Sequence, residues 1–239
     1  MILKCVATGS KDGNTYLLQS ADGRYIILDC GARYGAIEKA CDYRVDLIDF
    51  ALCSHIHSDH SDTIPQLLRH GIDVYTNHEV RERFKGCGWA CRNHTEVVNG
   101  WKFIPFTVPH THNDGEKCLN FAYMIEKDGE RLLYMTDWMY CPYNLSKLKI
   151  NHFLIAVNYT DPDLEEEPDG NIRHILQGHS SLKTAKEFLR TSMTDACRTI
   201  IACHLSQRNA DEDQILTELR ELAPNAEVAI AKKGMRIDL

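Results

Sequence analysis

The stretch that decides the fold is His55-Ile56-His57-Ser58-Asp59-His60, with three histidines and one aspartate in six residues. It follows a short apolar run, 49–54, which indicates a buried strand. If the chain stays extended, side chains alternate, so the first two histidines point the same way. The aspartate and the last histidine then turn back to a neighbouring position. Because unpaired polar groups are costly in a core, the cluster predicts two adjacent metal ions at this strand end.

Further polar side chains follow other apolar, strand-like runs. His110 and His112 come after a hairpin that turns at Asn99-Gly100, and Asp137 and His204 each follow a later run. Spacing alone does not choose between His110 and His112 as a ligand. Ligand-type residues at successive strand ends favour a layered α/β fold with one site at the sheet edges. Asp29, also at a strand end, is placed to hydrogen-bond ligand-bearing loops, with an ordinary Asx-turn as the alternative.

Hydrophobic periodicity and turn residues give the expected elements. Strands are expected at 2–8, 15–20, 24–29, 49–54, 72–76, 95–98, 101–106, 119–126, 131–136, 152–157, 198–203 and 227–231. Helices are expected at 33–42, at 59–69 with an early interruption at Pro65, and at 78–85, 171–177, 182–190 and 211–222. An acidic, proline-bearing loop, 161–169, could form a lid beside the strand ends.

Length and composition are those of an ordinary soluble globular protein. The 239 residues suit a single domain, 1–239, and contain 44% hydrophobic and 26% charged residues. No apolar stretch approaches a membrane span, and no signal-peptide pattern opens the chain. The ten scattered cysteines are expected to be reduced thiols in the cytoplasm. A net charge of −7 favours a small substrate over a long nucleic acid.

The metal-type residues described above resemble those of the metallo-β-lactamase fold superfamily over essentially the whole chain. The resemblance includes Leu28-Asp29-x-Gly31, Thr136-Asp137, Gly178-His179-x-Ser181 and His204-Leu205-Ser206. The last two motifs resemble the WalJ (YycJ)-like branch. Within it, the chain is similar to short phage and gut-bacterial members, which include anti-Pycsar phosphodiesterases that hydrolyse cyclic nucleotides.

The resemblance implies a four-layer αββα sandwich and two divalent metal ions. Zinc is the expected metal, with manganese or iron as alternatives, because imidazole and carboxylate ligands suit all three. The implied ligands are His55, His57 and His110 for the first ion, Asp59, His60 and His204 for the second, and Asp137 as the bridge. His112 departs from the family pattern, and we expect it to be exposed rather than to contact substrate.

Two candidate catalytic residues follow from the same resemblance, Asp59 and His179. An imidazolium at His179 would bind a phosphate oxygen or protonate the leaving alkoxide. A helix-capping or structural histidine is the alternative interpretation.

The favoured function is a phosphodiesterase that hydrolyses a small, cyclic nucleotide by metal-hydroxide attack at phosphorus. A WalJ-like nuclease acting on DNA or RNA is the alternative, and it predicts a basic track leading to His55 and His110. A binding module with purely structural metals fits poorly, because structural zinc sites close on four ligands. The resemblance also implies a homodimer and a role in phage anti-defence. No membrane partner is expected.

Overall fold

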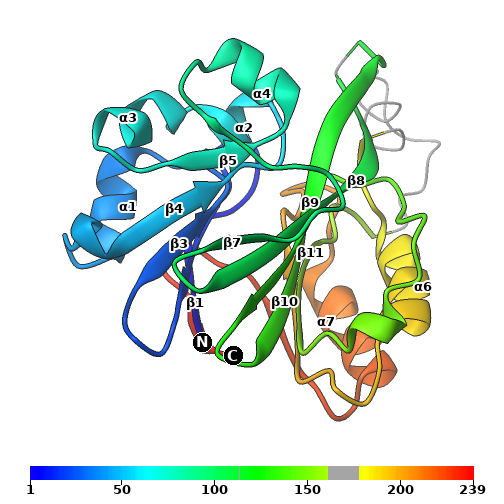
Figure 1. The fold of residues 1–239 in the computed structure, drawn as a ribbon. Helices are drawn as coiled ribbons and strands as arrows, with labels where there is room; N and C mark the ends of the chain where they lie inside the picture. Colours follow the sequence, from blue (N-terminus) through cyan, green and yellow to red (C-terminus); the bar gives the residue numbers. More distant parts are fainter. Residues whose placement is uncertain (113, 161–177) are drawn as a thin grey trace.

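The computed structural model describes residues 1–112, 114–160 and 178–239. Two seven-stranded sheets face each other, and helices cover their outer faces (Figure 1). This is the αββα arrangement that the resemblance implies, so the expected fold class is confirmed. The expected lid at 161–169 and helix at 171–177 lie outside the described residues.

The first sheet has the strand order β14-β1-β2-β3-β4-β5-β6. Its strands are β1 (Ile2–Ala7), β2 (Thr15–Gln19), β3 (Tyr25–Leu28), β4 (Ile48–Leu52), β5 (Val74–Thr76), β6 (Gly88–Trp89) and β14 (Arg236–Asp238). The predicted three-strand meander β1-β2-β3 is confirmed as antiparallel. From β3 to β6 the neighbours are parallel, and helices make the crossovers.

The second sheet has the strand order β13-β12-β11-β10-β9-β8-β7. Its strands are β7 (Glu96–Val98), β8 (Trp101–Thr111), β9 (Lys117–Lys127), β10 (Glu130–Met135), β11 (His152–Ala156), β12 (Thr199–Cys203) and β13 (Glu227–Ile230). Both predicted hairpins, β7-β8 and β9-β10, are present.

Strand β8 is longer than the sequence predicts. It was expected at 101–106, a range that includes Pro105, but it continues through a second proline, Pro109, to Thr111. Strand β7 pairs with β8 only as far as Phe103, so the later part of β8 lies at a sheet edge. A proline is tolerated there because its missing N–H need not serve a second neighbouring strand. His110 therefore lies inside the strand rather than after it.

Helices cover each sheet on its outer face (Figure 1). They are α1 (Tyr34–Ala40), α2 (Ser58–Ser61), α3 (Ile64–Arg69), α4 (His78–Arg83), α6 (Leu182–Ser192) and α7 (Glu212–Leu222). The expected helix 59–69 is in fact two helices, α2 and α3. Pro65 lies in the first turn of α3, where a missing N–H breaks no helical hydrogen bond. In the described ranges, no helix combines the length and apolar character needed to cross a bilayer.

Successive side chains along the strands of the first sheet pack into two different hydrophobic cores. Leu18 and Ile26 face the second sheet and join the large cluster between the sheets. Leu17 and Ile27 face the other way and pack in a second cluster with Ile37 of α1. Burial on both faces explains why these short strands are continuously apolar. The two cores hold the sheets rigidly, with the ends of β4, β10 and β12 available to carry polar groups.

Candidate metal centre

Seven side chains gather where β4, β8, β10 and β12 approach or reach their carboxyl ends. They come from four segments, which are the β4–α2 connection, strand β8, the second residue after β10 and the first residue after β12. The seven are His55, His57, Asp59, His60, His110, Asp137 and His204. These are the residues that sequence and resemblance predict as ligands, and the fold brings all of them together.

The first group consists of three imidazoles. The His55 Nε2 atom lies 3.0 Å from His57 Nδ1, and the His110 Nε2 atom lies 3.2 Å from the same nitrogen. His55 and His110 are buried, whereas His57 is half-buried. Three ring nitrogens that converge in this way, with a carboxylate beside them, could hold one divalent ion.

The second group combines one carboxylate with two imidazoles. The Asp59 Oδ2 atom lies 3.3 Å from His60 Nε2 and 3.4 Å from His204 Nε2. Both rings are buried, and the Asp59 side chain is 18% exposed. This group could hold a second ion that solvent reaches past Asp59.

Asp137 lies between the two groups. Its Oδ2 atom is 3.5 Å from His55 Nε2 and 3.3 Å from His60 Nε2, and its Oδ1 atom is 3.3 Å from His204 Nε2. The residue has φ +47°, and the Asn120 amide donates to its carbonyl at 2.7 Å. The strand end is thus turned so that one carboxylate faces both groups, as a bridging ligand must.

Four of the five rings have polar partners on their outward nitrogen. These contacts are His55 Nδ1 to Ser54 Oγ at 2.9 Å, His60 Nδ1 to Asp29 Oδ2 at 2.6 Å, His110 Nδ1 to the Gly178 carbonyl at 2.6 Å, and His204 Nδ1 to the Asn158 amide at 3.1 Å. Such outer contacts fix the tautomer and the orientation of a metal-binding imidazole. The ring orientations therefore do not depend on the inward contacts alone.

Asp29 holds the β4–α2 connection, as the sequence predicts. Its carboxylate accepts hydrogen bonds from the Ser54 backbone N–H at 2.7 Å and from the His60 ring at 2.6 Å. The Tyr134 hydroxyl, from the second sheet, donates to the same carboxylate at 2.5 Å. One buried aspartate thereby joins both sheets to the ligand-bearing segment.

Burial and neighbouring charges shift the pKa values of the cluster in opposite directions. Burial and the nearby His55 ring lower the pKa of His57 to about 3. Burial would raise the pKa of Asp137, but His204 and His60 outweigh it and hold that pKa well below its usual range. Burial opposes protonation of His60, yet Asp59 and Asp137 raise its pKa. The first group is therefore neutral and the carboxylates are ionised, which are the states that bind metal.

His179 lies against the cluster. Its ring stacks on His204 with centroids 5.4 Å apart, and its Nδ1 atom is 3.6 Å from Asp137 Oδ1. It precedes Ser181, whose side chain accepts from the Thr184 backbone N–H and begins α6. The helix start thus fixes the position of His179 beside the two ligand groups.

The expectation that His112 is exposed is wrong. The side chain is half-buried, and its Nδ1 atom lies 3.0 Å from His57 Nε2. The i, i+2 spacing of His110 and His112 was the available signal, because it places both on one side of an extended strand. His112 lies directly after β8, which extends to Thr111 rather than to the predicted end at 106.

Asn14 contacts the second group, a role that the sequence alone did not assign to it. Its amide lies 3.2 Å from Asp59 Oδ2 and 3.1 Å from His60 Nε2, and the side chain is fully buried. It follows Gly13, which has φ +82° and lies so close to Gly31 that a Cβ would be 2.4 Å from that backbone. The tight glycine pair is what lets the β1–β2 turn approach the second group.

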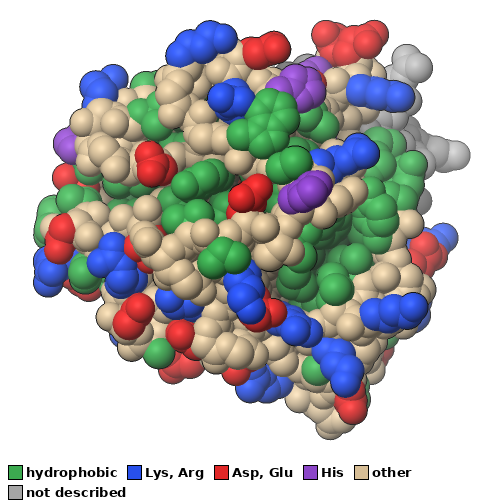
Figure 2. Space-filling model, in the orientation of Figure 1, with side chains coloured by type: hydrophobic (Ala, Val, Ile, Leu, Met, Phe, Trp, Pro, Cys, Tyr) green, Lys and Arg blue, Asp and Glu red, His purple; other side chains and the backbone are tan. Residues whose placement is uncertain are grey.

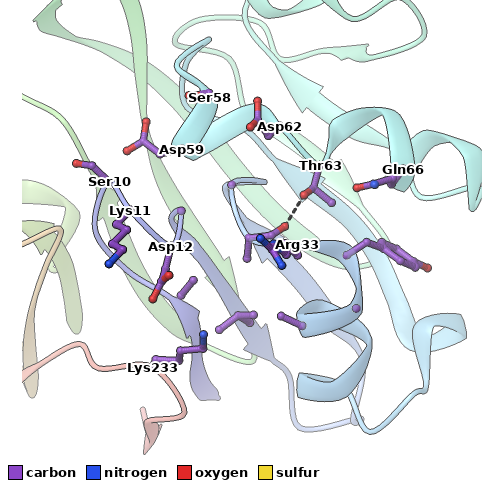
Figure 3. Close-up of a pocket in the computed structure, with 18 residues that line it drawn as sticks. Ser10, Lys11, Asp12, Arg33, Ser58, Asp59, Asp62, Thr63, Gln66 and Lys233 are labelled. Atoms are coloured by element: carbon purple, nitrogen blue, oxygen red, sulfur yellow. Dashed lines mark hydrogen bonds between the residues drawn. The ribbon is translucent and has the colours of Figure 1, made fainter.

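A polar cleft of about 920 Å³ lies beside the second group (Figure 3). Asp59 and Ser58 line one side of it, near Ser10 of the β1–β2 turn. Lys11, Arg33 and Lys233 also line the cleft, from three separate segments of the chain. None of these three cations forms an ion pair with a residue of the described ranges.

Comparisons with known proteins agree with the fold. Residues 24–204, which include all seven cluster residues, match the family model of the beta-lactamase superfamily domain. The structure is similar to the metallo-beta-lactamase fold protein YhfI from Bacillus subtilis, with a TM-score of 0.74, 16% identity, and coverage of 99% of this chain and 98% of that one. No curated protein sequence matches the chain.

Two further solved structures share the fold. Yeast PDE1 has a TM-score of 0.70 and 12% identity, and the match covers 100% of this chain and 99% of that one. The short form of human tRNase Z has a TM-score of 0.64 and 15% identity, with the same coverage of 100% and 99%. At these identities the likeness establishes the fold alone.

Proposed function

The chain belongs to the beta-lactamase superfamily as a metallo-β-lactamase-fold hydrolase, and we propose that it is a dinuclear phosphodiesterase acting on a small, cyclic nucleotide. The observation that carries the proposal is Asp137, whose carboxylate faces both the His55 and the His60 and His204 rings at 3.3–3.5 Å. A shared carboxylate is what two adjacent ions require, whereas one structural ion would close on four ligands.

The donor set fits two divalent ions, and zinc is the proposed metal. Imidazoles and carboxylates make up both groups without a cysteine ligand in either, which suits zinc and also manganese or iron. Ions bound here would supply Lewis acidity and an activated water for attack at phosphorus.

The protein's own residues would hold and orient the reacting groups. His55, His57 and His110 would keep the first ion in place as neutral ligands, and Asp59 would do so for the second. His179, stacked on His204 beside Asp137, is placed to contact a phosphate oxygen or to give a proton to the leaving alkoxide. The seven ligand roles and the catalytic roles of Asp59 and His179 form part of the proposal.

The cleft in Figure 3 supports a nucleotide-sized substrate. Its volume of about 920 Å³ lies within the range of small-ligand sites, and Asp59 lies on its wall. The lining combines three cations, Lys11, Arg33 and Lys233, with three aspartates, Asp12, Asp59 and Asp62, and the cations could contact the phosphate of a nucleotide bound here. A long nucleic acid would in contrast meet an acidic protein.

A nuclease is the second candidate, because the fold also resembles human tRNase Z. This candidate needs a basic track that leads to the ligand groups. On the face drawn in Figure 2, lysines and arginines are interspersed with acidic side chains rather than arranged in a continuous stripe. The small-nucleotide proposal is preferred because the chain has a net charge of −7, which disfavours binding of a long nucleic acid. The expected homodimer, cytoplasmic location and anti-defence role stay predictions.

A panel assay tests the proposal. Zinc- or manganese-loaded protein is incubated with cyclic mononucleotides and with single- and double-stranded DNA and RNA, with and without chelator. We expect one or more cyclic nucleotides to open to the monophosphate, and Asp137→Ala to lose at least about 1,000-fold of that rate because both ions depend on the bridge. Intact cyclic nucleotides together with cleaved DNA or RNA would select the nuclease instead.

A further inference from the structure

One ring of the cluster differs from the others in its outward partner. Four of the five histidines place their outward nitrogen against a hydroxyl, carboxylate, carbonyl or amide. His57 instead places Nε2 against another imidazole, with His112 Nδ1 at 3.0 Å. His57 is also the ring of the five that is half-buried, so packing restrains it less than the other four.

The inward contacts determine which nitrogen of His57 is free to donate. Its Nδ1 atom lies 3.0 Å from His55 Nε2 and 3.2 Å from His110 Nε2, so Nδ1 faces the first group. A neutral imidazole carries one N–H, and an inward lone pair on Nδ1 places that proton on Nε2. The outward Nε2–H then needs an acceptor, and His112 Nδ1 is the atom in reach.

We propose that His112 is a positioning residue, which accepts a hydrogen bond from His57 Nε2–H and thereby fixes the tautomer and orientation of the His57 ring. The inference rests on the proposed role of His57 as a ligand of the first ion. It predicts that the affinity for the first ion depends on His112, whereas the affinity for the second ion does not.

The backbone around His112 is built to hold the ring still. The His112 N–H donates to the Glu116 carbonyl at 2.8 Å, and the Gly115 N–H donates to the His112 carbonyl at 2.9 Å. These two bonds close the turn between β8 and β9. The His112 ring meets the His57 ring nearly edge-on, with centroids 5.1 Å apart and planes at 67°. The backbone bonds therefore define where the His112 side chain begins, and the ring contact places its Nδ1 atom against His57.

Cys118 offers a competing explanation. Its sulfur, one ring nitrogen of His57 and one ring nitrogen of His112 all lie within 4.8 Å of one another, so the three could form a separate metal site. In that arrangement Nε2 would be a ligand rather than a donor. The positioning role is favoured because Nδ1 of the same ring already faces the first group, but the two explanations predict different metal contents.

The experiment compares His112→Ala with His112→Asn in protein loaded with Co²⁺. Alanine removes the acceptor, whereas the asparagine Oδ1 atom can take the place of His112 Nδ1. We expect His112→Ala to weaken Co²⁺ at one of two sites by about 10–100-fold, the usual effect of losing an outer partner of a metal ligand. We expect His112→Asn to restore most of that affinity and the visible Co²⁺ spectrum. Unchanged circular dichroism confirms that both variants fold.

Three outcomes would overturn the inference. The first is that the His112→Ala variant binds two ions as tightly as wild type does. The second is a wild type with a third ion that both His112→Ala and Cys118→Ala lose, which would identify a separate site. The third is wild type that binds no ion, which also removes the proposed function. Wild type that binds two ions but cleaves no phosphodiester would instead remove the proposed function alone, because the effect of His112 on affinity is measured without substrate.

Discussion

At the scale of single residues, the candidate site depends on backbone conformations that most residues avoid. Asp29, Asp137 and His204 have φ values of +57°, +47° and +52°, and each lies one or two residues after the end of a strand. Aspartate, asparagine and histidine tolerate the left-handed region better than other non-glycine residues, at a cost of about 1–3 kcal/mol. The turn brings each side chain back toward the cluster instead of letting the strand direction carry it away. Strain at three strand ends is thus part of how the site is assembled.

Asp29→Asn is predicted to weaken the second ion more than the first, because Asp29 contacts His60 directly but reaches His55 only through Ser54. The carboxylate accepts from His60 Nδ1 at 2.6 Å and fixes its Nε2 atom toward Asp59. An amide is a weaker acceptor and can present an N–H instead, so we expect about a 10–100-fold loss of affinity at one site. Titration with Co²⁺ or Zn²⁺ measures the loss.

Asp49→Asn is the matched control for this prediction. The Asp49 side chain is equally buried and accepts from Arg24 and Trp101 at the start of β4, whereas the cluster lies beyond the end of that strand. It is expected to lower stability without changing either metal affinity. Equal metal affinities in Asp29→Asn and wild type would show that His60 does not need its outer partner.

At the scale of elements, the sequence predicted most of the architecture because its strands are short and strongly patterned. The meander, both hairpins and the strand before His55 were all predictable from apolar runs and turn residues. What could not be predicted depends on neighbours. Strand β8 continues past residue 106 and through Pro109 where its outer side is a sheet edge, and β14 forms by pairing with β1.

In the candidate site, too, some features follow from the local sequence pattern and others depend on tertiary contacts. The positions of His55, Asp137 and His204 after apolar runs were visible in the sequence, and the fold brings them together. The contact of His112 with His57 depends on the length of β8, and the contact of Asn14 with Asp59 depends on packing between two glycines. Both are consequences of tertiary structure that a local pattern does not contain.

Strand β11 carries a histidine that should make stability depend on pH. His152 is 1% exposed, and burial together with the charge of the chain's N-terminus lowers its pKa to about 4. Between pH about 6.5 and 4 the unfolded chain binds this proton and the folded chain does not. The stabilisation is therefore fully present above pH 6.5 and is lost as the pH falls toward 4.

His152→Gln is predicted to flatten this dependence. We expect the free energy of unfolding of wild type to fall more steeply than that of the variant between pH 7 and 4.5, as measured by urea titration. His94→Gln, at an exposed position, should follow the wild-type slope. Parallel curves for wild type and His152→Gln would mean that other groups account for the acid sensitivity.

At the scale of the whole molecule, the candidate centre joins the two sheets. His55, His57, Asp59 and His60 follow β4 of the first sheet, whereas His110, Asp137 and His204 come from the second. Each ligand group contains members from both sheets. The Tyr134 hydroxyl also bonds Asp29 across the same interface, and the Tyr123 hydroxyl bonds the Cys53 carbonyl. Bound ions would therefore act as cross-links of the sandwich as well as reactive groups.

Metal removal is accordingly predicted to lower the thermal stability of the molecule. An ion that binds only the folded chain, at a free concentration about 1,000-fold above its dissociation constant, stabilises by about 4 kcal/mol. For a chain of this length that corresponds to roughly 10 °C in Tm. Differential scanning calorimetry with and without chelator measures the shift, and added zinc should reverse it. Asp137→Asn removes the charge shared by both groups, so its Tm should respond to chelator much less than that of wild type. A wild-type Tm that chelator leaves unchanged would show that the hydrophobic core between the sheets, rather than any bound ion, holds them together.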